Sequence, residues 1–353
     1  MSTWLDLKDN PRLKGIYDTR LKIIKSIREF FWSQDFLETD TPIAARYPGQ
    51  EPYLNPMRTQ IHNPSGAAFD FFLHTSPEFA MKKLLAAGYK KIFQICHCFR
   101  DEEEFGGRHN PEFTMIEWYR APGELLEIAD DTENLFKYLG EKLGVKKINY
   151  KDFKIDISGE WDRKSMKEIW KIFINVNLDD YLEIEKIKIL VKERGFAVCE
   201  NDAYEDLFYK IFLNEIEPKL GLEKPIFIYD YPAQMCSLSR LCDNDKRYAE
   251  RFELYFGGLE LANAFGELTD AECQSRRLNE DKKLREKLGK QSYPVDKDFI
   301  NALKSGVPAG ENYSKKAAGI ALGVDRVVLL FSGAKDINET IFQSAKDQTE
   351  FDE

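Results

Sequence analysis

The sequence predicts an α+β protein, and three observations support this prediction. Residues 93–120 read as two strands joined by a charged loop, because side chains of two kinds alternate with period two in both arms. Residues 11–36 carry apolar side chains at helical spacing. Residues 319–323 form a further strand-like stretch in which small residues alternate, and an Asp-Arg pair follows it.

Length and composition indicate an ordinary globular chain. Its 353 residues suffice for one large domain or two small ones, and 43% of them are hydrophobic. The net charge of −10 disfavours broad, nonspecific binding to nucleic acid. The first residues lack an apolar signal region, and the apolar run at 327–331 is too short to span a bilayer. We therefore expect a cytoplasmic protein without a membrane partner.

The six cysteines lack the spacing of a disulfide framework or of paired CxxC motifs. Cys96, His97 and Cys98 suggest a metal site at first sight. In a strand, however, both thiols face away from His97, and no second ligand pair follows in the sequence. We expect reduced thiols rather than a metal centre.

The N-terminal third is predicted to contain a helix, a short extended run and a strand. The helix covers residues 11–36, with Asp18 or Thr19 as its N-cap, and residues 36–42 are extended. A strand at 69–73 leads into a helix that is expected to begin at Pro77 with Ser76 as its cap. A capped helix N-terminus after a strand is a natural site for a carboxylate or phosphate.

The loop of the 93–120 hairpin is unusually rich in charge. It carries Arg100, Glu102, Arg108, His109 and Asn110, with glycines at 106 and 107 as turn residues. Arginine forks bind phosphate oxygens, and glutamate can read an amine-bearing ring. By composition alone, a solvated charged hairpin explains these residues equally well.

The remaining elements follow in order. A helix covers 124–145, a mainly helical segment without motifs covers about 150–225, and a strand covers 226–231. Glu260 and Glu267 lie seven residues apart, so a flat strand would place them on opposite faces. Only a bend or bulge, which Ala262, Ala264 and Gly266 would permit, brings both to one site. By themselves they read as incidental glutamates of a tightly packed strand. Charged helices are expected near 270–289 and 296–305.

Three stretches resemble, in order, the three motifs of class II aminoacyl-tRNA synthetases in the form of the lysine branch. The helix and extended run ending at Pro42 are similar to motif 1. The residues FRDE at 99–102, HNPEFTM at 109–115 and EWY at 117–119 are similar to motif 2. Motif 3 is similar to GIALGVDR at 319–326. The resemblance implies an antiparallel sheet flanked by helices, one catalytic domain over residues 1–353, and a homodimer formed through motif 1.

The chain most resembles the free-standing paralogues that attach (R)-β-lysine to a lysine of translation elongation factor P. ERFE at 250–253 and GLELAN at 258–263 support this resemblance. Motif 1 begins within the first few dozen residues, so we expect the anticodon-binding domain of a lysyl-tRNA synthetase to be missing. The resemblance implies activation of (R)-β-lysine or lysine by ATP and Mg²⁺, followed by transfer to elongation factor P, with tRNA an improbable acceptor.

The resemblance also assigns site residues. Arg100 would hold the α-phosphate, Glu102 and Asn110 would read the adenine region, and Phe113 and Arg326 would sandwich the ring. Asp101, Leu261 and Gly323 complete the ATP set, and Glu260 and Glu267 would carry Mg²⁺ against the phosphates. The amino-acid pocket would use buried carboxylates that suit a diammonium substrate; its residues are Ser76, Pro77, Glu78, Glu117, Tyr119, Glu267 and Ala321. Arg100, Glu260, Glu267 and Arg326 would be catalytic.

Two departures and two alternative functions remain. The loop at 306–318, with Glu311, Lys315 and Lys316, is longer than is usual in the family, and the motif 2 loop is one residue longer. Ala321 stands where lysyl-tRNA synthetases typically have glycine. A truncated synthetase paralogue could instead load α-lysine on tRNA or another acceptor. A degenerate, non-catalytic binding paralogue is the other alternative, although a binding relic does not need both carboxylates and both arginines.

Overall fold

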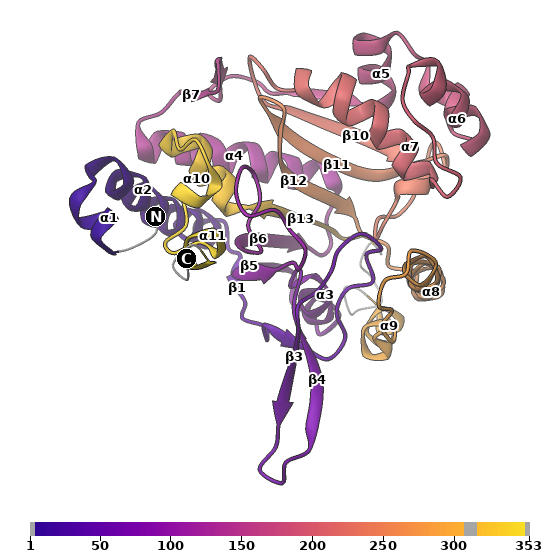
Figure 1. Cartoon of the computed structure of the whole chain (residues 1–353), viewed down its shortest axis with the longest axis horizontal. Coiled ribbons are helices and arrows are strands. Elements are labelled where there is room, and N and C mark those ends of the chain that lie inside the picture. The colour runs from indigo at the N-terminus through magenta and orange to yellow at the C-terminus, as the bar shows by residue number, and fades with distance from the viewer. Residues whose placement is uncertain (1–3, 307–315, 350–353) are drawn as a thin grey trace. The chain divides into compact units, whose positions relative to one another are not determined.

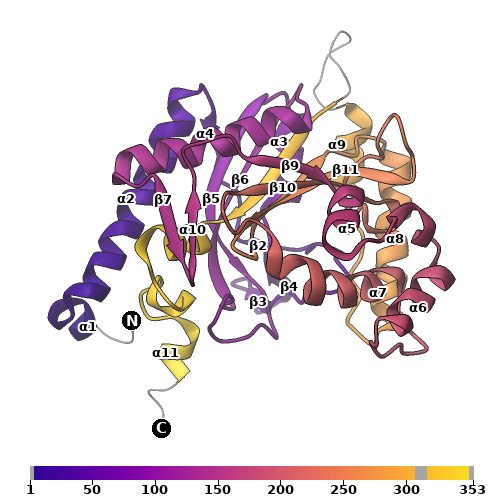
Figure 2. The ribbon, with the colours of Figure 1, turned by 90° about the horizontal axis from the view of Figure 1, so that it is seen from above.

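The computed structural model describes residues 4–306 and 316–349, so Glu311 and Lys315 of the long loop lie outside the described residues. The chain divides into two compact units, residues 1–124 with 268–353, and residues 125–267. Their elements are labelled in Figure 1 and seen from above in Figure 2. Among the described residues, no helix is long and apolar enough to cross a membrane.

The first unit combines strands and helices from both ends of the chain. Its N-terminal elements are α1 (Trp4–Asp9), α2 (Pro11–Ser33), β1 (Leu37–Glu38), β2 (Ala44–Ala45), β3 (Arg58–His62), β4 (Ala68–Leu73), α3 (Glu78–Ala86), β5 (Lys91–Phe99) and β6 (Glu112–Arg120). Its C-terminal elements are α8 (Ala271–Lys287), α9 (Lys297–Ser305), β13 (Ala318–Gly323), α10 (Val324–Ser332), η5 (Ile337–Glu339) and α11 (Ala345–Thr349). Strands β3 and β4 form an arm that projects from this unit (Figure 1).

Helix α2 confirms the predicted N-terminal helix, but its N-cap lies before the residues expected to cap it. Asn10 is the N-cap, and its side chain accepts hydrogen bonds from the backbone N–H groups of Arg12 and Leu13. Pro11 occupies the first helical turn, where its missing N–H costs nothing. Asp18 and Thr19 therefore lie inside the helix, and the prediction of a cap at either was wrong.

The predicted hairpin is confirmed as β5 and β6, which pair antiparallel over their whole length. In this unit the strand order is β1-β5-β6-β13, with β13 antiparallel to β6 and the short β1 parallel to β5. Phe31 of α2 packs on Phe93 and Trp118, with ring centroids 5.0 Å from each. Helix α2 therefore covers the face of the hairpin that carries Phe93 and Trp118. Because side chains alternate along a strand, Cys96 and Glu117 lie on the opposite face.

A buried ion pair joins the three motif segments of this unit. Arg20 of α2 pairs with Asp325 of α10, and only 8% and 3% of these residues is exposed. Asp325 also accepts the backbone N–H of Thr114 at 2.7 Å, and Arg20 donates to the Thr114 hydroxyl at 2.7 Å. The Asp of the Asp-Arg pair therefore anchors the helix that follows β13 to α2 and β6.

The second unit holds the middle of the chain. Its elements are α4 (Leu125–Leu143), β7 (Lys147–Tyr150), β8 (Phe153–Asp156), β9 (Asp162–Ser165), α5 (Met166–Ile174), η1 (Leu178–Tyr181), α6 (Ile184–Glu193), α7 (Tyr204–Ile211), η2 (Phe212–Ile216), η3 (Glu217–Lys219), β10 (Ile226–Pro232), η4 (Ala233–Met235), β11 (Tyr248–Phe256) and β12 (Leu259–Gly266). Here the strand order is β12-β11-β10-β9; the β10–β11 and β11–β12 pairs are antiparallel and β9 is parallel to β10. Each unit thus has a sheet with mainly antiparallel pairing and flanking helices, as predicted.

The segment at 150–225 is richer in strands and better packed than the sequence suggests. Besides the expected helices it contains β8 and β9, which are short and lack a clear alternation. Helices α5, α6 and α7 gather together (Figure 2) and enclose aromatic side chains such as Trp170, Phe208 and Phe212. Ile169 is fully buried, whereas Ile172 is 60% exposed. This segment therefore has a core of its own.

Candidate functional site

A carboxylate cluster lies where β4 leads into α3 and faces β6. Ser76 donates a hydrogen bond from its hydroxyl to Glu117 at 2.5 Å, and Tyr119 donates to the other oxygen of Glu117 at 2.6 Å. The Ser76 hydroxyl also accepts the backbone N–H of Glu78 at 3.0 Å. Helix α3 begins at Glu78 with Pro77 as its N-cap, so the predicted helix start at Pro77 with Ser76 as the cap was wrong by one residue. The structure brings together four of the residues predicted for the amino-acid pocket.

Burial controls the charge of this cluster. Only 1% of Glu117 is exposed, and burial, reinforced by the nearby Glu78, raises the pKa of the Glu117 carboxyl to about 8. Glu78 forms an ion pair with the buried Lys82, one helical turn away. A buried carboxyl that titrates near neutral pH is typical of a functional site, because an arriving ammonium group would stabilise its charged form.

Strand β13 pairs with β6 on the side away from β5. Ala321 lies directly opposite Glu117 in the register, and Gly323 lies opposite Met115. Side chains of directly opposed residues project from the same face of a sheet. Ala321 is therefore a cross-strand neighbour of Glu117, and its place in an amino-acid pocket stays a prediction.

Arg100 and Phe113 lie in contact at the loop end of the hairpin. The guanidinium carbon of Arg100 is 4.9 Å from the centroid of the Phe113 ring. The backbone N–H of Arg100 donates to the Pro111 carbonyl at 2.9 Å, which continues the pairing of the two arms beyond β5. The arginine and the aromatic ring thus lie next to each other at the loop end of the hairpin.

The loop residues predicted to read adenine have defined contacts. Glu102 accepts a hydrogen bond from Asn55 at 2.5 Å and has a left-handed φ of 60°, while its backbone N–H donates to the Asp101 carboxylate at 3.0 Å. Asn110 is buried; its amide donates to the Glu112 carbonyl and accepts the backbone N–H of Ala345 at 3.3 Å. Asn110 therefore holds the loop in shape, and its contact with adenine stays a prediction.

Arg326 lies at the start of α10 and reaches the tip of the same loop. Its Nη2 is 3.0 Å from Nε2 of His109, and its Nε donates to the carbonyl of Arg108 at 3.4 Å. The predicted sandwich of an adenine ring between Arg326 and Phe113 stays a prediction. The structure does place both side chains on segments that meet at this loop.

In the second unit, a bulge changes the faces of β12. Leu254 is opposite Ala262, but the next residue, Tyr255, is opposite Glu260, so Leu261 is the extra residue. The predicted irregularity therefore exists, at Leu261 rather than at Ala262, Ala264 or Gly266. Beyond it, Phe265 is opposite Arg251. Since Arg251 and Tyr255 are four residues apart, Glu260 and Phe265 share a face, and Glu267 continues it two residues later.

The residue types of this carboxylate pair fit a hard cation. Glu267 is buried and Glu260 half-buried, and both present oxygen ligands on one face of β12. Gly266, which precedes Glu267 in the chain, lies in close contact with β11. A Cβ at this position would lie 2.6 Å from Oε2 of Glu250. Both carboxylates offer the oxygen ligands that Mg²⁺ takes, and the metal assignment stays a prediction.

The sequence analysis missed a buried polar network on the same face of β11. Glu253 accepts hydrogen bonds from the hydroxyls of Tyr231 and Tyr255 on one oxygen, each at 2.5 Å, and from Arg251 on the other at 2.6 Å. Burial raises the pKa values of both tyrosines, so they remain donors. The alternation of Arg251, Glu253 and Tyr255 was a signal, because three polar groups at period two mark a polar sheet face.

Comparisons with known proteins identify the family of this chain. Residues 1–346 match the family described as tRNA synthetases class II (D, K and N). The elongation factor P–(R)-β-lysine ligase of Pseudoalteromonas translucida is 36% identical over 326 residues, which are 91% of this chain and 93% of that protein. Proteins of the same name from Avibacterium paragallinarum and Pasteurella multocida are 36% and 34% identical, over 92% and 91% of this chain and 93% and 92% of their own lengths.

Proposed function

This chain belongs to the tRNA synthetase class II family (D, K and N), and on that premise we propose that it activates (R)-β-lysine with ATP and transfers it to a lysine side chain of elongation factor P. The observation that carries the substrate class is the buried carboxylate cluster of Ser76, Glu78, Glu117 and Tyr119. Glu78 already pairs with Lys82, and a diammonium amino acid would supply positive charge to the Glu117 carboxylate. The names of the similar proteins support the β isomer and the protein acceptor.

The proposed reaction has two steps. The carboxylate oxygen of the amino acid attacks the α-phosphorus of ATP, which forms the mixed anhydride and releases pyrophosphate. The amine of the acceptor lysine then attacks the anhydride carbonyl, loses a proton, and displaces AMP to leave an amide. The contribution of the protein is to position the reactants and to stabilise charge.

The chain's own residues divide this work. Arg100, which lies against Phe113, would bind the α-phosphate. Arg326, which meets His109 at the loop tip, would sandwich the adenine ring with Phe113. Glu102, with Asp101, Asn110, Leu261 and Gly323, would complete the nucleotide site. Glu260 and Glu267 would hold Mg²⁺, which when bound neutralises phosphate charge. Ser76, Pro77, Glu78, Glu117, Tyr119 and Ala321 would hold the amino acid. We expect the enzyme to act in the cytoplasm as a homodimer.

Exchange of labelled pyrophosphate into ATP, dependent on a lysine isomer, tests the adenylation step. Glu267→Gln removes one charge from the metal pair, and we expect it to lower exchange by a factor of at least about 100, equal to roughly 3 kcal/mol of transition-state stabilisation. Glu272→Gln on the exposed side of α8 is the matched control and should retain wild-type exchange. Near-wild-type exchange in Glu267→Gln would remove the metal assignment, and absence of exchange with every lysine isomer would overturn the proposed function.

A further inference from the structure

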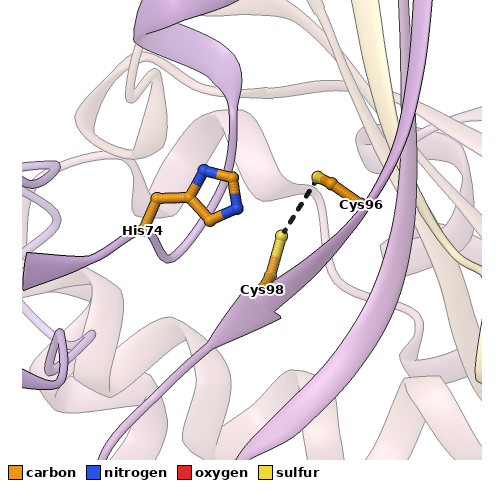
Figure 3. Close-up of side chains that lie close together, drawn as sticks. All are labelled: His74, Cys96 and Cys98. Atoms are coloured by element: carbon orange, nitrogen blue, oxygen red, sulfur yellow. Dashed lines mark hydrogen bonds between the residues drawn. The ribbon is translucent and has the colours of Figure 1, made fainter. Parts of the chain in front are cut away.

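Two cysteines and a histidine that are distant in the sequence meet on the site face of β5. Cys96 and Cys98 are two residues apart on the strand and project to the same side, with their sulfur atoms 3.9 Å apart (Figure 3). His74 follows β4, and its ring points toward them (Figure 3). One ligand atom from each residue lies within 4.8 Å of the other two.

The distance between the two sulfur atoms is close to that in a tetrahedral zinc site. A tetrahedral Zn²⁺ ion with bonds of about 2.3 Å to sulfur holds two sulfurs roughly 3.8 Å apart, so the thiols need almost no movement. The His74 nitrogen lies within 4.8 Å of both sulfurs, so its ring must move closer to complete the third bond. Two thiols and an imidazole are the donors that zinc prefers, whereas Mg²⁺ and Ca²⁺ prefer oxygen.

The backbone holds the histidine to the strand that carries the thiols. The Nε2 of His74 is 2.7 Å from the carbonyl oxygen of His97, between the two cysteines. The backbone N–H of Phe99 donates to the His74 carbonyl at 3.0 Å. Such outer contacts commonly orient a ligating imidazole. Binding through Nδ1 would keep the ring's hydrogen bond, whereas binding through Nε2 would replace it and release the ring proton.

Burial leaves one approach to the cluster. Cys98 is fully buried and 5% of His74 is exposed, whereas Cys96 is half-buried. Metals bind the thiolate form of cysteine, and a bound cation favours loss of the thiol protons.

We propose that His74, Cys96 and Cys98 form a binding site for one zinc ion. These three residues leave the fourth coordination position to another ligand, on the side of the half-buried Cys96. Each cysteine binds as a thiolate, and any proton that it still carries passes to solvent. The site is separate from Glu260 and Glu267 in ligand type: sulfur and nitrogen here, oxygen there. Cys96 lies opposite Met115 in the register, two residues from Glu117, so the zinc would lie in the wall of the amino-acid pocket.

Direct binding of Zn²⁺ to the reduced, chelator-treated chain tests this site without reference to catalysis. In competition with a chromophoric chelator, we expect one equivalent of Zn²⁺ per chain, and Co²⁺ in its place should give thiolate-to-cobalt absorption. Cys98→Ser and His74→Gln should each weaken Zn²⁺ binding by more than about 10-fold. Cys199→Ser and Cys273→Ser remove thiols outside the cluster and should bind as the wild type does.

Folding of the variants is checked by circular dichroism, and Zn²⁺ should raise the melting temperature of the wild type but not of Cys98→Ser. Equal Zn²⁺ affinity in wild type, Cys96→Ser and Cys98→Ser would overturn the proposal, as would binding that a millimolar excess of Mg²⁺ abolishes. A further consequence rests on the proposed function: Zn²⁺ should inhibit lysine-dependent pyrophosphate exchange in the wild type and less in Cys98→Ser. If exchange fails while one-to-one zinc binding holds, only the proposed function is wrong.

Discussion

At the scale of single residues, the position of Ala321 makes substrate choice testable. Its methyl group lies beside Glu117 in the β6–β13 register. Close-packed walls respond to a single methyl group, and one such group discriminates between ligands by about 10–200-fold. Moving an amine from the α to the β carbon displaces an ammonium group by about one bond length. This displacement is similar in size to a methyl group, so the Ala321 methyl can distinguish the two isomers.

We predict a preference for (R)-β-lysine over α-lysine that Ala321→Gly reduces. The measurement is the ratio of pyrophosphate exchange rates with the two isomers in wild type and variant. Ala318→Gly is the control, because it removes a methyl group from the same strand three residues away, on the other face. The same isomer ratio in wild type and Ala321→Gly would show that Ala321 only packs the strand.

Glu117 is the residue whose ionisation should affect stability. Its pKa is raised from 4.5 to about 8 in the folded chain by burial and by Glu78. Between these values the folded chain holds a proton that the unfolded chain has released. The sign follows from linkage: stability falls as pH rises from about 4.5 to about 8, by at most about 1.4 kcal/mol per pH unit.

We therefore predict that Glu117→Gln, which cannot ionise, gains stability relative to wild type as pH rises through this window. Urea unfolding of both proteins at several pH values between 5 and 8 measures the difference in free energy. Titrating groups that do not interact with Glu117 contribute equally to both proteins, so their contributions cancel in that difference. A difference that stays constant over this range would show that the Glu117 pKa is not raised.

At the scale of elements, the Arg20–Asp325 pair is the clearest test of how the motif segments hold together. Removing one partner leaves a buried charge without compensation, which commonly costs 3–5 kcal/mol. We predict that Asp325→Asn lowers the free energy of unfolding by about that amount, because Arg20 is buried against β6 and α10. Equilibrium unfolding in urea measures this loss.

The control lies on the same helix. Lys25 and Glu29 form an exposed pair one turn apart on α2, so Glu29→Gln should cost no more than about 0.5 kcal/mol. Losses of equal size in both variants would mean that the buried pair contributes no more than a surface pair. Near-wild-type stability in Asp325→Asn would mean that an amide satisfies Arg20 and Thr114 as well as the carboxylate does.

At the scale of the whole molecule, net charge bears on the acceptor. The chain carries −10, and attraction to a phosphate backbone depends on neutralising cations, so nonspecific binding of tRNA is disfavoured. We predict that incubation with ATP, (R)-β-lysine and elongation factor P adds one lysyl mass to the factor, read by intact mass. Lysylation of tRNA with no mass gain on the factor would contradict this, and a factor variant without its acceptor lysine is the control.

The sequence by itself determined the local elements and their order. Period two in residues 93–120 requires two faces, so it predicts both the hairpin and which side chains share the face with Glu117. The spacing of Glu260 and Glu267 also indicated that the two could share a face only across a bend or bulge, although not where it lies. These inferences succeed because they depend on neighbours along the chain, whose geometry the backbone repeat fixes.

Only the tertiary structure decided which distant residues meet. The bulge lies at Leu261 because pairing with β11 sets the register, and strand β9 forms because the distant β10 completes it, whereas β8 pairs with the adjacent β7. The thiols of Cys96 and Cys98 acquire His74 as a third neighbour, although 22 residues separate it from the nearer cysteine. Asp325 likewise meets Arg20 across most of the chain. Sequence spacing does not encode such contacts, because they arise when separate elements pack into one core.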